Sequence, residues 1–189
     1  RNLQLQDARR QLAEQATIDE MTGLRNRRGV NIIINDELAR MKRMQLPIAV
    51  IALDVDHFKT YNDNYGHPAG DQVLQQLANV MLEMTSRAGE FAARMGGEEF
   101  VLFYPTVNRT AALELAEELR MKVLGLKIPH EKSLTAEYVT VSIGVISCVP
   151  EWELEFDTLL KAADDVLYLS KTSGRNRVTC GELEASDTS

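Results

Sequence analysis

The stretch FAARMGGEEFVLFY at residues 91–104 decides the fold of this chain. Two strand-like apolar runs, 91–95 and 98–104, are separated there by Gly96-Gly97. Because glycine readily adopts the positive φ angles of a two-residue turn, the stretch predicts a β-hairpin that turns at these two glycines. The chain should therefore contain at least one pair of antiparallel strands.

The segments on either side of the hairpin predict helices and further strands. The run IAVIALD at 48–54 is continuously apolar and ends in an acid, which is typical of a central strand buried on both faces. Shorter apolar runs predict strands at 139–147 and 177–180. Apolar residues at helical spacing predict helices at 1–16, from Asn26 to Pro47, at 58–65, after a turn at 66–71, at 109–124 and at 156–172. This order predicts an α/β or α+β fold around one mixed or antiparallel sheet.

The composition fits a globular domain and narrows the range of partners. The chain has 189 residues, 44% of them apolar and 26% charged, which is enough for one domain with a sizeable core. Its formal charge of −7 argues against a nucleic-acid polymer as partner, because such binders carry a basic surface. Cys148 and Cys180 form no metal-binding pattern, so two reduced thiols are expected.

The ends of the sequence indicate a piece of a longer protein. Neither a signal peptide nor an apolar run long enough to span a bilayer is present, so we expect a cytoplasmic location with no membrane contact by this fragment. Because the sequence starts at Arg1 and not at Met, an upstream sensor or membrane anchor is expected. The polar end at 181–189 is expected to be disordered.

Three acids stand at predicted strand ends. Asp54 closes the buried strand, and Glu98 and Glu99 follow the hairpin turn. If the hairpin lies beside the strand that ends at Asp54, one glutamate converges with it, and converging carboxylates favour a cation such as Mg²⁺. The alternative is that these acids are solvated loop residues.

Basic and polar residues elsewhere could bind a nucleotide. Lys171 and Arg175, near the end of the last helix, could hold phosphates or simply complement the helix dipole, and Lys59 is a second phosphate candidate. Asn62 and Asp71 flank the turn before the long helix. They could stabilise that turn and the start of the helix. Alternatively, they could recognise guanine, because a carboxylate can accept hydrogen bonds from its N1–H and N2–H groups.

Five sequence blocks resemble, in order, those of the GGDEF family of diguanylate cyclases. GGEEF at 96–100 matches the signature that names the family, in one of its two active variants. The other blocks are DEMTGLRNRR (19–28), LDVDHFKTYNDNYGHPAGDQVL (53–74), VSIGV (141–145) and ADDVLYLSKTSGRNRV (163–178). Met21 replaces the family's usual leucine in the first of them. The resemblance covers about residues 17–180, the expected GGDEF domain.

The resemblance implies a fold and an activity. The fold would be a central five-stranded, mostly antiparallel sheet wrapped by helices, similar to the nucleotidyl cyclase fold and the polymerase palm. The activity would be condensation of two GTP molecules into cyclic di-GMP (c-di-GMP) with release of pyrophosphate, dependent on Mg²⁺ or on Mn²⁺ as a substitute. Two facing domains in a homodimer are expected. The alternative is an inactive GGDEF module that binds GTP or c-di-GMP and signals to a partner domain.

The resemblance also assigns site residues by position. The metal ligands would be Asp54, the Val55 carbonyl, Glu98 and Glu99. Glu98 and Glu99 would be the catalytic residues, with Glu99 a metal ligand or the base for the attacking 3′-hydroxyl. The substrate-binding residues would be His57, Phe58, Lys59, Asn62, Asp71, Gly96, Gly97, Lys171 and Arg175. Arg94 would support the site.

Residues 1–16 form a predicted linker helix with two heptad-spaced leucines. Leu5 and Leu12 are seven positions apart, which fits either a solvated extension or the end of a coiled coil. The resemblance favours a signalling helix that sets how two domains meet.

One departure from the family concerns regulation. Many members carry an RxxD product-inhibition site where this chain has Arg87-Ala88-Gly89-Glu90. Because glutamate replaces the aspartate, we expect product inhibition to be weak or absent. Trp152 is expected to be a packing residue, and His67 and His130 are given no catalytic role.

Overall fold

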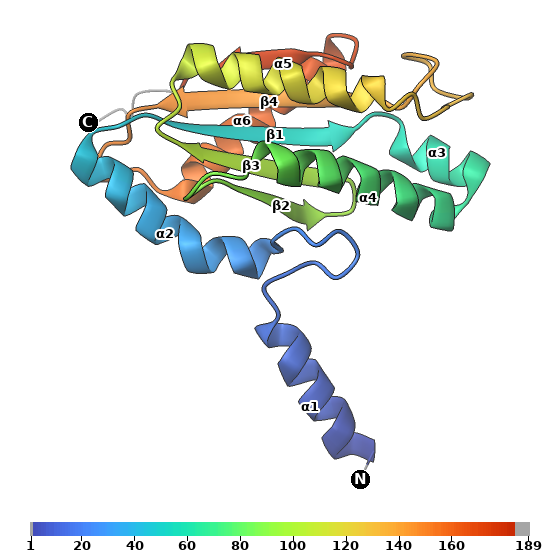
Figure 1. The fold of residues 1–189 in the computed structure, drawn as a ribbon, viewed down its shortest axis with the longest axis horizontal. Helices are drawn as coiled ribbons and strands as arrows, with labels where there is room; N and C mark the ends of the chain where they lie inside the picture. Colours follow the sequence, from blue (N-terminus) through green and yellow to red (C-terminus); the bar gives the residue numbers. More distant parts are fainter. Residues whose placement is uncertain (1, 184–189) are drawn as a thin grey trace.

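The sheet has five strands in the order β2-β3-β1-β4-β5, as Figure 1 shows for this computed structural model, which describes residues 2–183. The strands are β1 (Ile48–Val55), β2 (Phe91–Gly96), β3 (Glu99–Pro105), β4 (Val141–Cys148) and β5 (Val178–Gly181). Neighbouring strands are antiparallel except for β4 and β5, which are parallel. The prediction of a mostly antiparallel, five-stranded sheet is confirmed.

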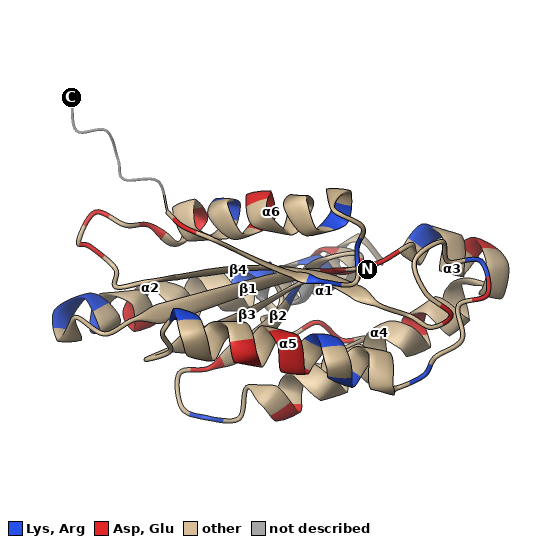
Figure 2. Cartoon of the chain, turned by 90° about the horizontal axis from the view of Figure 1, so that it is seen from above, with Lys and Arg blue, Asp and Glu red and all other residues tan. Residues whose placement is uncertain are grey.

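Helices cover both faces of the sheet. Alternate residues of β1 face two groups of helices, because successive strand residues point to opposite sides. One group is α2 (Arg27–Met44) and α6 (Phe156–Thr172), and the other is α3 (Phe58–Tyr65), α4 (His67–Met84) and α5 (Arg109–Gly125). Figure 2 shows α6 on one side of the sheet and α4 and α5 on the other. All eight residues of β1 are buried, as predicted for a central strand.

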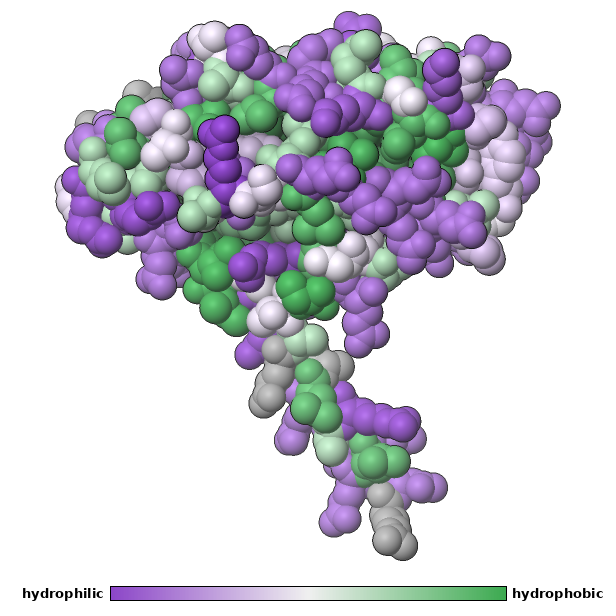
Figure 3. Space-filling model, viewed as in Figure 1, coloured by the Kyte–Doolittle hydropathy of each residue, from purple (hydrophilic) through white to green (hydrophobic). Residues whose placement is uncertain are grey.

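Helix α1 (Asn2–Gln15) projects away from the sheet (Figure 1). Leu3, Leu5 and Leu12 are 75%, 55% and 67% exposed. Figure 3 shows this helix standing clear of the body, with hydrophobic and hydrophilic residues both at its surface. The leucine side chains are therefore accessible to a second helix.

The hairpin turns one residue later than predicted. Gly96 pairs with Glu99, so the turn residues are Gly97 and Glu98. The strand register shifts between Arg94 and Gly96, and this bulge lengthens β2 before the turn. Gly97 has a φ of 49°, which explains why the turn needs glycine at that position. Glu98 consequently lies in the turn, whereas Glu99 begins β3.

Two helix bounds also differ from the prediction. Helix α4 begins at His67, so the predicted turn at 66–71 is wrong beyond Gly66. Pro68 lies in the first turn of this helix, where backbone N–H groups have no partner within the helix, so the missing N–H of proline costs no hydrogen bond. Helix α2 ends at Met44, before Pro47, with the following residue left-handed at a φ of 51°. The other helices and strands match the predicted bounds within two residues.

Several smaller expectations can be compared with the structure. The prediction that Trp152 is a packing residue is wrong, because Trp152 is 65% exposed. Cys148 and Cys180 are unpaired, as expected. Strand β5 includes Gly181, and the predicted disorder of 184–189 lies outside the described residues. None of the helices within residues 2–183 has the length and apolar character needed to cross a bilayer.

Candidate active site

Two carboxylates meet at the C-terminal end of β1. Asp54 pairs directly with Glu99 across the antiparallel strands β1 and β3. The side chains of such a pair project from the same face of the sheet. Asp54 is 6% exposed, whereas Glu99 is open to solvent. The structure thus brings together one buried and one exposed carboxylate.

Lys171 neutralises part of this charge. Its Nζ lies 2.6 Å from Oδ2 of Asp54. Burial raises the pKa of Asp54 to about 6, which outweighs the hydrogen bond and the charge of Lys171, while the charges of Glu98 and Glu99 raise it further. A cation close to Asp54 therefore stabilises its ionised form. Lys171, predicted to hold a phosphate, is placed on this carboxylate.

The oxygen atoms around Asp54 fit a hard cation such as Mg²⁺. A backbone hydrogen bond of 3.4 Å from the Val55 N–H to the Glu98 carbonyl brings the hairpin turn against the end of β1. Within residues 2–183, no three Asp, Glu, His or Cys side chains gather closely enough to hold an ion by themselves. Mg²⁺ commonly takes one or two protein carboxylates and completes its shell with substrate phosphates and water. The donor set therefore fits an ion that binds together with a nucleotide.

A further acid, Asp56, has a structural role that the sequence did not reveal. It is 3% exposed and accepts hydrogen bonds from Thr140 Oγ1 (2.7 Å), Ser142 Oγ (2.5 Å) and the Asn176 N–H (3.0 Å). Three donors satisfy this buried carboxylate, as buried charges require. The third bond ties the turn after α6 to the end of β1.

The charge of Arg175, in the turn after α6, acts on His57 at the start of α3. The burial of His57 and the positive charge of Arg175 lower the pKa of this histidine. Helix α3 has no side-chain cap at its N-terminus, so the N–H groups of its first residues, Phe58 and Lys59, remain available to an anion. These groups are suited to holding phosphates.

The side chain of Asn62 on α3 packs against Gly70, the residue that precedes Asp71 on α4. The Asn62 Oδ1 atom is buried and has no hydrogen-bond partner among the described residues. It lies against Gly70 so closely that a Cβ at position 70 would be 1.8 Å from it. Asp71 follows directly and is exposed. Gly70 thus leaves room for the Asn62 side chain. The sequence did not predict this role, because Gly70 was assigned to the turn at 66–71 and not to a helix.

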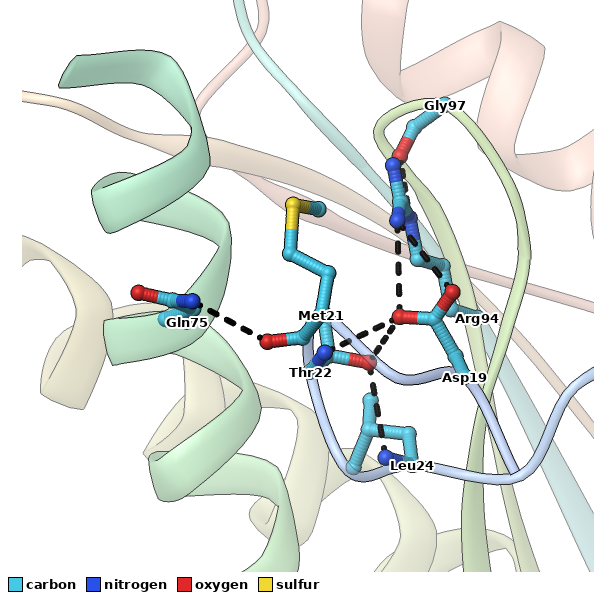
Figure 4. Close-up of polar contacts among 7 residues, drawn as sticks. All are labelled: Asp19, Met21, Thr22, Leu24, Gln75, Arg94 and Gly97. Atoms are coloured by element: carbon cyan, nitrogen blue, oxygen red, sulfur yellow. Dashed lines mark hydrogen bonds and ion pairs between the residues drawn. The ribbon is translucent and has the colours of Figure 1, made fainter. Parts of the chain in front are cut away.

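Arg94 fixes the tip of the hairpin and ties it to the segment before α2 (Figure 4). Its Nε donates to the Gly97 carbonyl at 2.8 Å, and its guanidinium lies 3.3 Å from Oδ1 of Asp19. Asp19 also accepts from the N–H and the hydroxyl of Thr22, at 3.0 and 2.6 Å. Gln75 on α4 donates to a carbonyl of the same segment at 3.2 Å. Arg94 thus supports the signature turn, as a structural bridge.

A groove of about 550 Å³ lies beside this bridge. Its lining includes Arg27, Arg28 and Arg94 but none of the acids Asp54, Glu98 and Glu99. The lining also includes Gly96 and Gly97, both predicted to bind the substrate, so the groove reaches the signature turn beside the two glutamates.

The sequence matches the family model described as "Diguanylate cyclase, GGDEF domain" over residues 16–177. The chain belongs to the GGDEF family. This GGDEF chain is 38% identical to the response regulator PleD of Caulobacter vibrioides over 167 residues, which are 87% of the chain and 36% of PleD. It is 31% identical to the diguanylate cyclase DosC of Escherichia coli over 161 residues, 85% of the chain and 34% of DosC. The chain thus spans about a third of the length of these curated relatives.

Solved GGDEF structures share the fold. The coiled coil and GGDEF domain of DgcB from Caulobacter crescentus, in complex with c-di-GMP, matches with a TM-score of 0.79 and 31% identity, over 94% of this chain and 92% of that one. The active GGEEF domain of a diguanylate cyclase from Vibrio cholerae matches with a TM-score of 0.70 and 32% identity, over 85% and 98%. The fold implied by the family resemblance is confirmed.

In this GGDEF domain the turn before β2 carries Arg87 and Glu90. Oε2 of Glu90 accepts from the Arg87 N–H at 3.3 Å, and the Glu90 N–H donates to the Arg87 carbonyl at 3.1 Å. Gly89, with a φ of 82°, packs against the ion pair of Glu37 and Arg40, which are 2.8 Å apart. The Glu90 carboxylate is therefore directed back to its own turn.

Proposed function

We propose that this GGDEF domain is a diguanylate cyclase, which condenses two GTP molecules into c-di-GMP and releases pyrophosphate. The observation that carries the proposal is the pairing of Asp54 with Glu99 beside Lys171. Carboxylates that can hold a divalent cation, next to basic side chains, are the combination that transfer of phosphoryl and nucleotidyl groups uses. Relatives of this chain that are named diguanylate cyclase support the assignment.

Mg²⁺, or Mn²⁺ in its place, would be held by Asp54, the Val55 carbonyl, Glu98 and Glu99. When bound, the ion would supply positive charge that stabilises the phosphate oxygens as the bond breaks. The raised pKa of Asp54, about 6, supports this role because a buried carboxylate gains from a second cation.

Each domain would bind one GTP between the start of α3 and the start of α4. The Asp71 carboxylate would accept from N1–H and N2–H of guanine, a pattern that adenine lacks, and the Asn62 carboxamide would contact the same base. Arg175, Lys171 and the N–H groups that follow His57 would hold the terminal phosphates. The uncapped start of α3 and the charge of Arg175 acting on His57 support this placement.

The reaction would occur between two facing domains. The 3′-hydroxyl of one GTP attacks the α-phosphorus of the other, a new O–P bond forms, the bond to the bridging oxygen breaks, and pyrophosphate leaves. Glu99 would accept the proton of the hydroxyl, and a second, equivalent step closes the ring. Holding two substrates in register replaces a bimolecular encounter, which supplies much of the acceleration.

Helix α1 would control how the two domains meet. Its exposed leucines provide an apolar stripe for pairing in a homodimer. The DgcB structure includes a coiled coil, and the diguanylate cyclase SiaD of Pseudomonas aeruginosa, solved with its activator SiaC, matches this chain with a TM-score of 0.75 and 30% identity. We infer that an upstream sensor acts through α1 and that the domain works in the cytoplasm, where GTP is available.

Product formation tests the proposal. The purified chain would be incubated with GTP and Mg²⁺, alongside a Glu99→Gln variant, and the nucleotides separated by chromatography. We expect c-di-GMP from the wild type and none from the variant. If the wild type is silent, an artificial dimeriser fused before α1 should restore activity. Continued silence with measurable GTP binding would refute the enzyme and favour the inactive binding module.

A further inference from the structure

The segment between α5 and β4 packs over the start of α3. His130, within this segment, is 1% exposed. Its Nε2 lies 3.0 Å from the carbonyl oxygen of His57, and the ring of Tyr61 meets its ring edge-on at 5.2 Å. A buried histidine outside the family motifs thus contacts the residue that precedes the proposed phosphate-binding N–H groups.

The chemistry of this contact fixes the role of His130. A carbonyl oxygen can only accept, so Nε2 of His130 must carry the proton that it donates to His57. The other ring nitrogen, Nδ1, is buried and has no hydrogen-bond partner among the described residues. With no second group to exchange a proton with, His130 is placed to hold the His57 carbonyl and not to relay protons.

A second hydrogen bond holds the side chain of His57. Its Nε2 lies 2.8 Å from the Thr135 hydroxyl. The same segment is closed on itself, because the Ser133 N–H donates to the His130 carbonyl at 3.1 Å and the Thr135 N–H donates to the Ser133 hydroxyl at 3.2 Å. The segment therefore holds His57 through two hydrogen bonds, one to its backbone carbonyl and one to its imidazole ring.

His57 needs such support because of its backbone conformation. Its φ of 52° and ψ of 37° lie in the left-handed region, which is unfavourable for residues other than glycine. Residues in this region persist where surrounding contacts hold them. His57 connects the end of β1, which carries Asp54, to the first N–H groups of α3. A change in its φ and ψ would redirect those N–H groups.

We propose that His130 is a positioning residue for the triphosphate of the substrate. By holding His57 in its left-handed conformation, it keeps the first N–H groups of α3 directed at the terminal phosphates. This inference rests on the proposed GTP site, but it concerns a residue that touches neither the nucleotide nor the metal ligands. Guanine recognition by Asn62 and Asp71 would depend on it much less.

Two nucleotides separate this role from a general effect on folding. The ligand 3′-deoxy-GTP keeps the three phosphates but lacks the attacking hydroxyl, and GMP lacks the terminal phosphates. His130→Leu keeps a similar volume without a donor, and His130→Gln restores an N–H donor. We expect His130→Leu to weaken 3′-deoxy-GTP binding about fivefold, as for one lost hydrogen bond, and to leave GMP binding within about twofold. His130→Gln should recover most of the affinity.

Calorimetric titration with both ligands, together with thermal unfolding, decides the outcome. Unchanged 3′-deoxy-GTP affinity in His130→Leu, or equal losses for both ligands, would overturn the inference. If His130→Leu does not fold, Thr135→Val is the substitute, because Thr135 is half-buried and its hydroxyl contacts the ring of His57. An unchanged ratio of the affinities for 3′-deoxy-GTP and GMP in Thr135→Val would likewise overturn the inference. A wild type that binds 3′-deoxy-GTP no better than GMP would instead refute the proposed phosphate site itself.

Discussion

Replacing Gly70 with alanine would displace the side chain of Asn62 while leaving every proposed ligand of the nucleotide in the sequence. The added Cβ would lie 1.8 Å from Oδ1 and 2.9 Å from Cγ of Asn62, and 3.2 Å from Cζ of Phe58. Since non-bonded carbon contacts are about 3.5–4.0 Å, Oδ1 would have to move by roughly 1.5 Å or more. Oδ1 is the end of a flexible side chain, so we expect Asn62 to rotate away and the helices to stay in place.

The cost should fall on binding and not on folding. One or two hydrogen bonds from the carboxamide to guanine, at about 1 kcal/mol each, correspond to a rise of about 5- to 30-fold in the Kd for GTP. Alanine within a helix is more stable than glycine by about 0.5–1 kcal/mol, which offsets the rearrangement of Asn62. The melting temperature of Gly70→Ala should therefore stay close to that of the wild type.

Calorimetric titration of GTP provides the assay, with two comparisons. Gly125→Ala is the matched control, because Gly125 ends α5 and nothing lies within 4 Å of its would-be Cβ. Adding Gly70→Ala to Asn62→Ala should weaken GTP binding no further, since the first change acts through the second residue. A folded Gly70→Ala variant with wild-type affinity, or a loss fully additive to that of Asn62→Ala, would refute this reasoning.

Three further predictions concern acids. Because the folded-state pKa of Asp54 is raised from 3.8 to about 6, its ionisation costs stability as the pH rises through that range, so Asp54→Asn should gain stability over the wild type between about pH 4 and pH 7 in thermal unfolding. A difference in stability between Asp54→Asn and the wild type that does not grow with pH would contradict this prediction. Asp71→Ala should weaken GTP binding at least about tenfold and leave Mg²⁺ binding nearly unchanged, whereas equal losses would argue against guanine recognition. Glu90→Asp should tighten c-di-GMP binding, because the shorter side chain reaches the Arg87 N–H of its own turn less well. A titration with the product measures the affinity, and Arg87→Ala serves as the non-binding control. An affinity of Glu90→Asp no higher than that of the wild type would argue against a product site at Arg87 and Glu90.

The element types could be predicted because hydrophobic period and capping residues are local signals. The bounds of α6 match the prediction because apolar residues run at helical spacing from Phe156, and Gly174 follows the end of the helix with a φ of 122°. The start of α4 was misplaced because Gly66, Pro68 and Gly70 look like a turn, although proline is tolerated in a first helical turn and Gly70 is required by a neighbour.

Contacts between distant segments were beyond what sequence patterns could predict. The turn position depends on a bulge opposite β3, and no local signal marks which of Gly96 and Gly97 will pair. The carboxylate pair could be predicted from the sequence, because one acid ends a buried strand and the other follows a hairpin turn. In contrast, His130 and His57 are 73 positions apart, and only the packing of the segment after α5 brings them together.

The hydrogen bonds of Arg94 also determine where a truncated form of this protein should begin. Asp19 lies 75 positions before Arg94, between α1 and α2, and belongs to neither helix. A truncation chosen from the α/β body alone would begin at α2. It would discard Asp19, which contacts the guanidinium of Arg94, and Arg25, whose carbonyl accepts from the Arg94 N–H at 2.8 Å. The shortened domain would hold the signature turn more loosely, so we expect the proposed cyclase activity to be lower in it than in the longer chain. The stretch at 17–26, which resembles a mere connector, is thus part of the smallest unit that preserves the site.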